Sequence, residues 1–187
     1  MTGRPRSFDR DVALAAAVEQ FWRHGYDETT IAGLTKAMGV TPPSLYAAFG
    51  DKEQLFQEAS TAYFRRTCEG IDQAATLPTA REAVAAMLDG TARAHTDAAT
   101  PPGCLVLTEP RLVAQRQAVL DRLRDRLDRG VREGDLAPGT RTDQLASYLL
   151  AVMRGMSGCA RDGGSTEDVL AIAETALHAV AGPATIR

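Results

Sequence analysis

Hydroxyl groups and a cation that could bind nucleic-acid phosphates are concentrated in residues 30–52. Thr30 and Thr41 each stand directly before a short run of helical periodicity, a position at which threonine acts as an N-terminal cap. The free backbone N–H groups of such helix starts, together with the cap hydroxyls, bind phosphate oxygens. Tyr46 lies off the apolar face of the second run, and Lys52 stands at the start of a third. These four side chains are therefore candidate phosphate ligands.

Two short helices are predicted to position these groups. The first begins after Thr30 and ends at Gly39, and the second begins with Pro42 and ends at Gly50. Gly39 and Val40 form a tight turn between them, which is the arrangement of a helix-turn-helix. The second helix of such a motif enters the major groove of DNA with its first turn toward the base edges. In this chain that turn carries Thr41, Pro42, Pro43 and Ser44.

The charge balance excludes a broadly basic surface. The net charge of the chain is −3, and residues 1–60 hold six basic and eight acidic side chains. DNA binding by this region would therefore depend on a few placed groups. Arg4 and Arg6, ahead of the first helix, are expected to reach a minor groove or phosphates. Because few phosphates would be neutralised, weak non-specific affinity is predicted.

The whole chain is predicted to be helical. Its 187 residues include 32 Ala and 18 Leu against 15 Val and Ile, a composition that favours helix over strand. Helical periodicity recurs along the sequence without a sustained alternating pattern. The fold class is therefore all-α. Helices are expected from Ser7 as cap to Gly25, and then over 52–75, 79–95, 104–108, 110–134, 142–161 and 166–181.

Two helical surfaces of the C-terminal part differ in polarity. The charged side of the helix over 110–134 is predicted to be solvated, with Asp125/Arg129 and Asp128/Arg132 as ion pairs within the helix. The last two helices are apolar over most of their circumference, so a second subunit is expected to cover them. The candidate residues of this dimer interface are Leu145, Leu149, Val152, Met156, Val169, Ile172, Ala176 and Val180.

A family resemblance rests on the helix-turn-helix residues. Gly39-Val40, Leu45-Tyr46, Phe49, Lys52 and Leu55 follow the Gly-Val-x-x-x-x-Leu-Tyr-x-x-Phe-x-x-Lys-x-x-Leu pattern of the TetR/AcrR family, which the chain resembles over about residues 8–60. The resemblance implies an all-helical homodimer, most often a repressor, that binds a palindromic operator. The N-terminal residues indicate an amphipathic helix rather than a signal peptide, so the cytoplasm is the expected compartment. It implies a helix-turn-helix domain over 1–57 and a larger ligand-binding and dimerisation domain over 58–187.

The same resemblance assigns roles to single residues. It implies phosphate contacts by Thr30, Tyr46 and Lys52 and base contacts from Thr41 to Ser44. Ala32, Ala47 and Ala48 depart from the family's larger side chains. Hydrogen bonds from Thr41 and Ser44, with apolar contacts by Pro43 or Ala48 to thymine methyl groups, are therefore the expected means of base recognition.

A pocket for a small, largely apolar effector is implied in the C-terminal domain. Tyr63 and Thr108 would be its polar groups, and ordinary core packing is the equal alternative for every candidate. The candidate lining residues are Tyr63, Met87, Thr91, Leu107, Thr108, Leu120 and Met153.

Other classes of function have little support in the sequence. It has no Gly-rich phosphate loop or nucleophile elbow, and its histidines and cysteines share no metal-ligand spacing, so neither an enzyme nor a cofactor is expected. No apolar run approaches the ~18 residues that cross a membrane. Two alternatives stay open: a ligand-binding dimer that has lost operator binding and acts through protein contacts, and a regulator with a redox switch at Cys104 or Cys159.

Overall fold

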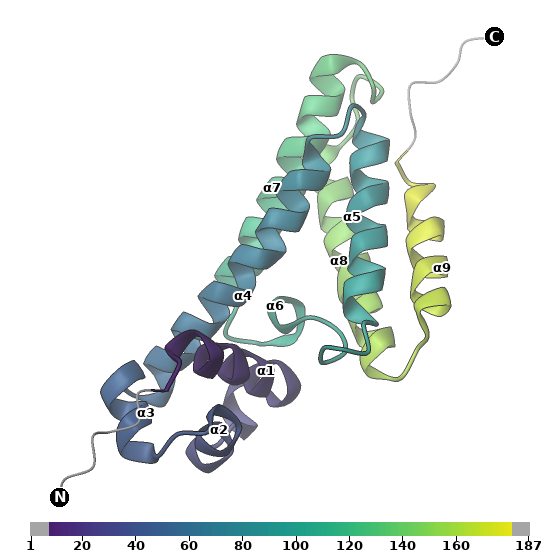
Figure 1. The fold of residues 1–187 in the computed structure, drawn as a ribbon. Coiled ribbons are helices and arrows are strands. Elements are labelled where there is room, and N and C mark those ends of the chain that lie inside the picture. The colour runs from purple at the N-terminus through teal and green to yellow at the C-terminus, as the bar shows by residue number, and fades with distance from the viewer. Residues whose placement is uncertain (1–7, 181–187) are drawn as a thin grey trace, which may run out of the picture. The chain divides into compact units, whose positions relative to one another are not determined.

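The computed structural model describes residues 8–180, and these are helical, as predicted, with no strand among them. Figure 1 shows their course. The helices are α1 (Arg10–Glu28), α2 (Ile31–Met38), α3 (Pro42–Phe49), α4 (Lys52–Ala75), α5 (Ala80–His95), α6 (Leu105–Thr108), α7 (Val113–Glu133), α8 (Thr142–Arg161) and α9 (Thr166–Leu177).

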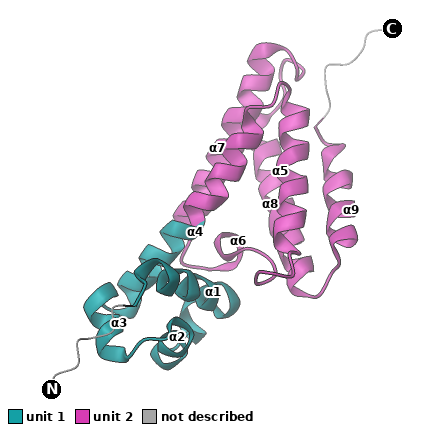
Figure 2. Ribbon diagram, in the orientation of Figure 1, with its two compact units in different colours: residues 1–63 teal, residues 64–187 magenta. Residues whose placement is uncertain are grey.

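The described chain divides into two compact units, 1–63 and 64–187, coloured separately in Figure 2. None of its helices is both long and apolar enough to span a bilayer.

Unit 1 holds α1, α2, α3 and the first part of α4 around a small aromatic core. Phe21 and Phe56 are buried, with ring centroids 5.1 Å apart in an edge-on contact, and Tyr26 lies 5.0 Å from Phe56. Leu34 and Leu45 bring α2 and α3 into the same core and are fully buried. Burial of these large apolar side chains supplies most of the free energy that holds the four helical segments together.

The ends of α1 differ in detail from the prediction. Asp9 rather than Ser7 caps the helix, since its carboxylate accepts hydrogen bonds from the backbone N–H groups of Asp11 and Val12. Gly25 interrupts the helical geometry with φ 69° and ψ 179°, as its position in the sequence suggested. The backbone then resumes a short turn to Glu28, and the buried Thr29 hydroxyl donates to the carbonyl of Gly25 at 2.6 Å.

Unit 2 is a helical bundle in which α8 packs against α5, α7 and α9, and α5 packs against α9. Its fully buried side chains include Leu88, Leu123, Leu127, Leu149 and Met156. Capping boxes open α5 at Thr79/Glu82, as predicted, and α9 at Ser165/Asp168. The last helix ends at Leu177, four residues before the predicted end.

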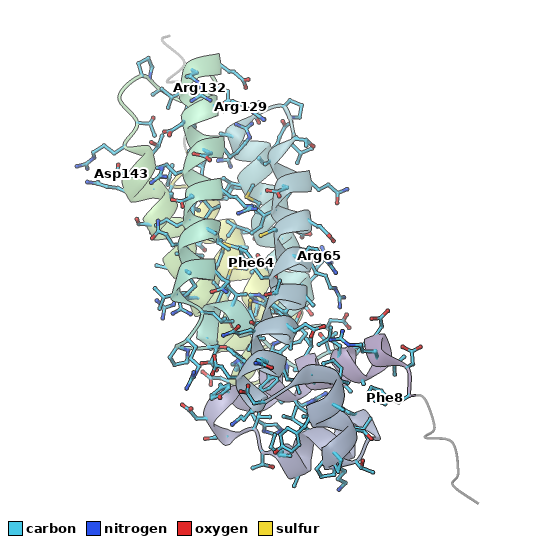
Figure 3. All side chains as sticks on the ribbon, turned by 90° about the vertical axis from the view of Figure 1, so that its left-hand side faces the viewer. Phe8, Phe64, Arg65, Arg129, Arg132 and Asp143 are labelled. Carbon is cyan, nitrogen blue, oxygen red and sulfur yellow. The ribbon has the colours of Figure 1, made fainter. Side chains whose placement is uncertain are left out.

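The charged side of α7 does not form the predicted solvated ion pairs. The Arg129 guanidinium donates to the carbonyl of Ala75 at the end of α4 and forms an ion pair with Glu133 instead. Asp128 accepts a hydrogen bond from Thr142 of α8. Phe64 lies between α4 and α7 while Arg65 points away from α7 (Figure 3), so this face of α7 is in part a helix-packing surface.

Candidate nucleic-acid interface

Capping interactions fix both helices of the helix-turn-helix. The Thr30 hydroxyl accepts a hydrogen bond from the N–H of Gly33 at 3.0 Å, and the Thr41 hydroxyl accepts one from Ser44 at 3.4 Å. Between them Gly39 adopts a left-handed conformation with φ 66°, and its N–H bonds the carbonyl of Thr35. A left-handed residue ends α2 abruptly without a steric penalty only as glycine. The turn predicted from Gly39 therefore has a stereochemical cause.

The recognition-helix candidate α3 presents two distinct faces. Leu45 and Phe49 are buried against the rest of unit 1, whereas Pro42, Pro43 and Tyr46 are exposed, Tyr46 to 49%. Ala47 is also exposed, and Ser44 and Ala48 are half-buried. A short helix with an exposed first turn and an exposed tyrosine meets the needs of groove binding.

The hydroxyls of Thr41 and Ser44 are already hydrogen-bonded to each other. Their oxygens lie 3.0 Å apart at the start of α3. Each hydroxyl has one donor and two acceptor positions, so this bond uses part of their capacity and fixes their direction. The two predicted base-contacting hydroxyls thus form one prearranged polar pair at the exposed end of the helix.

Lys52 is the predicted cation at the start of α4. It is half-buried, and its Nζ lies 4.3 Å from the centroid of the Tyr26 ring, a cation–π contact that holds the long side chain in place. The Asp51 carboxylate caps α4 by accepting from the N–H of Gln54 at 2.8 Å. Lys52 is therefore an ordered charge beside a helix N-terminus. The two predicted arginines of the arm, Arg4 and Arg6, lie outside the described residues.

A further contact, which the sequence analysis missed, joins three helices of unit 1. Arg10 at the start of α1 donates two hydrogen bonds to the carboxylate of Glu58 on α4, at 2.5 and 2.8 Å. Its guanidinium carbon lies 4.5 Å from the centroid of Phe49 on α3. The first cause of the raised pKa of Arg10 is this bond to Glu58. Because the partners are 48 residues apart, local spacing could not reveal them.

Comparisons with known proteins decide the family. A family model described as bacterial regulatory proteins of the tetR family matches residues 13–59. The HTH-type transcriptional repressor ComR of Escherichia coli K12 is 33% identical over 191 residues, which cover 94% of this chain and 90% of ComR. The chain belongs to the TetR family. The repressor BdcR of the same organism is 31% identical, over 95% of this chain and 92% of its own.

A solved structure shows the same TetR architecture. A cysteine mutant of the TetR family regulator CifR, complexed with 26-base-pair operator DNA, has a TM-score of 0.88 and 39% identity, covering 96% of this chain and all of that one. The predicted family and the all-α helix-turn-helix fold are thus confirmed. The TetR family and these relatives are DNA-binding transcriptional regulators rather than enzymes.

The candidate effector residues of this TetR chain lie in different environments. Met87, Thr91, Leu107 and Met153 are buried in unit 2, and Leu120 is half-buried. Thr108 is exposed, and its hydroxyl donates to the carbonyl of Cys104 at 2.7 Å. Tyr63 belongs to unit 1, where its ring packs edge-on against Trp22 at 4.9 Å. The two predicted polar groups therefore have other contacts, and the apolar candidates stay candidates.

The predicted dimer surface needs correction. Leu149, Met156, Val169, Ala176 and Val180 are at most 2% exposed in the single chain, so they form its own core and leave no surface for a partner. The prediction was wrong for these five because other helices of the same chain cover them: α8, with Leu149 and Met156, packs against α5, α7 and α9, and α9 packs against α5 and α8. Three candidates remain half-buried at the surface, namely Leu145, Val152 and Ile172.

The buried polar groups that the structure describes in unit 2 do not form a metal site. Within residues 8–180 no group of three or more His, Cys, Asp or Glu side chains could hold a metal ion. His95 is 6% exposed, and its Nδ1 has no hydrogen-bond partner. Burial, with a smaller contribution from the charge of Arg161, lowers the pKa of His95 from 6.5 to about 4. His95 is therefore neutral at physiological pH.

Proposed function

We propose that this protein is a ligand-responsive transcriptional repressor that binds a palindromic operator as a homodimer. The observation that carries the proposal is the division of α3 into a buried face, with Leu45 and Phe49, and an exposed first turn that includes Pro42 and Pro43. The TetR relatives, among them a regulator complexed with operator DNA, support the same activity. Unit 1 would bind the DNA, and unit 2 would hold the effector and the dimer contacts.

The contacts with DNA would divide into positioning and recognition. Thr30, Tyr46 and Lys52 would contact phosphates, which fix the register on the duplex without reading sequence. The Thr41–Ser44 hydroxyl pair and the exposed Pro43 would face base edges. Because this set lacks a side chain that could form a bidentate bond with a base, apolar contacts with thymine methyl groups would supply much of the selectivity.

Dimerisation would set the spacing of the two recognition helices. The exposed Tyr148, together with the half-buried Leu145 and Val152, gives α8 an apolar surface that another copy could cover. A two-fold dimer would place two α3 helices about 34–36 Å apart, one turn of DNA, and so select a palindrome. A largely apolar effector that binds better to a different arrangement would shift the population away from DNA binding.

Fluorescence polarisation on DNA from upstream of the protein's own gene tests this proposal. We expect salt-sensitive, sequence-selective binding that Tyr46→Phe and Lys52→Gln each weaken about tenfold, the loss of about one charged or phosphate hydrogen bond. Arg132→Gln, an exposed charge in unit 2, is the matched control and should bind as the wild type does. Absence of selective binding there and in a genomic selection would contradict the proposal and favour a regulator that acts through protein contacts.

A further inference from the structure

The Arg10 side chain connects three helices of unit 1 from the surface. It leaves the first turn of α1, forks onto Glu58 of α4, and lies over the ring of Phe49 near the end of α3. Its Nη2 also lies 3.4 Å from the carbonyl oxygen of Ala48 in the last turn of α3. Carbonyls of a last turn lack helical partners and carry partial negative charge, so a guanidinium there is favourable.

Phe49 also contacts Phe8, which lies just ahead of the Asp9 cap of α1. The ring centroids of Phe8 and Phe49 are 6.3 Å apart, and Phe49 itself is 5% exposed. Phe8, labelled in Figure 3, and Arg10 therefore both bear on the C-terminal end of α3. The other end of α3, with Thr41 and Pro42, is the exposed end that would enter a groove.

We infer that the Arg10–Glu58 pair positions the recognition helix for operator binding and that Arg10 is not itself a phosphate ligand. The inference rests on the function proposed above. A guanidinium that shares both fork hydrogen bonds with a carboxylate has its charge largely neutralised, and the adjacent carboxylate would repel a phosphate. Helix α3 has only eight residues, so contacts that hold its C-terminal end also set the direction in which its N-terminal end points.

The two readings of Arg10 predict opposite effects of removing Glu58. If Arg10 were a phosphate ligand, Glu58→Gln would release it and remove a negative charge, and affinity would rise. If the pair positions α3, Glu58→Gln and Arg10→Gln both weaken operator binding. Arg10→Lys would keep the charge but lose the planar fork and its stacking on Phe49, so it would not restore affinity.

The experiment measures operator affinity across a salt series for Arg10→Gln, Arg10→Lys, Glu58→Gln and the double variant Arg10→Gln/Glu58→Gln. We expect each single variant to bind about tenfold more weakly, the double variant to be no weaker than either, and the slope of log affinity against log salt to match the wild type. Tighter or unchanged binding by Glu58→Gln, or a slope lowered by about 0.9 in Arg10→Gln, would overturn the inference.

A matched control and a DNA-free readout complete the test. Glu19 and Arg23 form an exposed ion pair within α1, at 3.8 Å, that connects no other helix, so Glu19→Gln should not weaken binding. Amide hydrogen exchange of α3 should become about two- to threefold faster in Glu58→Gln, as the loss of an exposed ion pair allows, and stay unchanged in Glu19→Gln. Unchanged exchange in Glu58→Gln would overturn the inference, whether or not the wild-type protein binds an operator. Failure of the wild-type protein to bind any operator would contradict only the proposed function.

Discussion

Each unit contains an arginine that reaches the carbonyl end of another helix, but the two arginines differ in their burial. Arg10 in unit 1 is 48% exposed at its side chain and shares its charge with Glu58. Arg126 of α7 in unit 2 is 1% exposed at its side chain and donates to the carbonyls of Leu77 and Pro78, at 3.1 and 3.2 Å, just beyond the end of α4. The carboxylate nearest to it, that of Asp135, is 3.7 Å away.

The difference in burial predicts different roles. An exposed ion pair is screened by water and salt and contributes little to folding, although its geometry can orient a helix. A buried guanidinium has lost its hydration, which is the first cause of the lowered pKa of Arg126, and its Nε and Nη1 have no hydrogen-bond partner. Its remaining bonds are therefore costly to break. We therefore expect an arginine at the carbonyl end of a helix to orient that helix in unit 1 and to stabilise the fold in unit 2.

Arg126→Ala should produce the largest effect. The substitution leaves a cavity and removes the only cation within 4 Å of Asp135 among the described ion pairs. It also takes away the hydrogen bond that Arg126 donates to the Pro78 carbonyl, so we expect a loss of about 3–5 kcal/mol in the free energy of unfolding. Urea unfolding measures it. The control Arg132→Ala, at an exposed position six residues further along α7, should change the free energy by less than about 0.5 kcal/mol. Equal effects of the two variants would remove the distinction between buried and exposed arginines.

Acid should weaken unit 2 through His95, the second largest effect. Its pKa is about 4 in the folded protein and 6.5 as an unperturbed side chain, so between these values the unfolded chain binds more protons. The free energy of unfolding therefore falls as the pH falls from 6.5 to about 4, by about 3 kcal/mol in total. Urea titrations at several pH values measure the slope, and hydrogen exchange assigns it to a unit.

Two variants isolate the contribution of His95. His95→Gln should flatten the pH dependence between 6.5 and 4, whereas His178→Gln, at an exposed position near the end of α9, should retain it. A pH dependence that persists in His95→Gln would show that other groups cause the acid sensitivity.

The contrast between local and distant contacts also explains what the sequence could predict. Caps and turn residues such as Thr79, Gly39 and Gly134 act within a few residues, and the helices they bound were predicted closely. The family signature likewise lies in one continuous stretch, so the recognition helix followed from it. Arg126 and the Leu77 carbonyl are 49 residues apart, and only the fold brings them together.

The errors at the dimer surface have the same origin. Helical periodicity shows that Leu149 and Met156 share an apolar face of α8, but it does not show what covers that face. Intrachain neighbours cover it completely, since both residues are 0% exposed. The partner of a buried surface is a property of the tertiary arrangement, which periodicity within one helix does not contain.

Two glycines extend the comparison to the backbone, with effects of intermediate size. A Cβ at Gly130 on α7 would meet Asp135 Oδ1 and lie 2.8 Å from Ala80 Cβ, so Gly130→Ala should cost about 1–3 kcal/mol by overpacking unit 2. A Cβ at Gly39 would meet nothing within 4 Å, but φ is +66°, so Gly39→Ala should cost about 1–2 kcal/mol through the backbone alone. Asparagine tolerates this conformation, so Gly39→Asn should recover part of the lost stability. Gly130→Asn, in contrast, should be less stable than Gly130→Ala. Thermal unfolding of the four variants separates the two causes.

The smallest expected effect is that of Arg10→Gln on stability, and it tests the comparison most directly. Because the pair with Glu58 is about half exposed, we expect the melting temperature to change by less than about 2 °C, and by still less at 1 M salt, where the Debye length is about 3 Å. The same variant should weaken operator binding about tenfold. A large fall in melting temperature would mean that Arg10 holds unit 1 together as Arg126 holds unit 2, and the loss of DNA affinity would then follow from unfolding rather than from a misdirected α3.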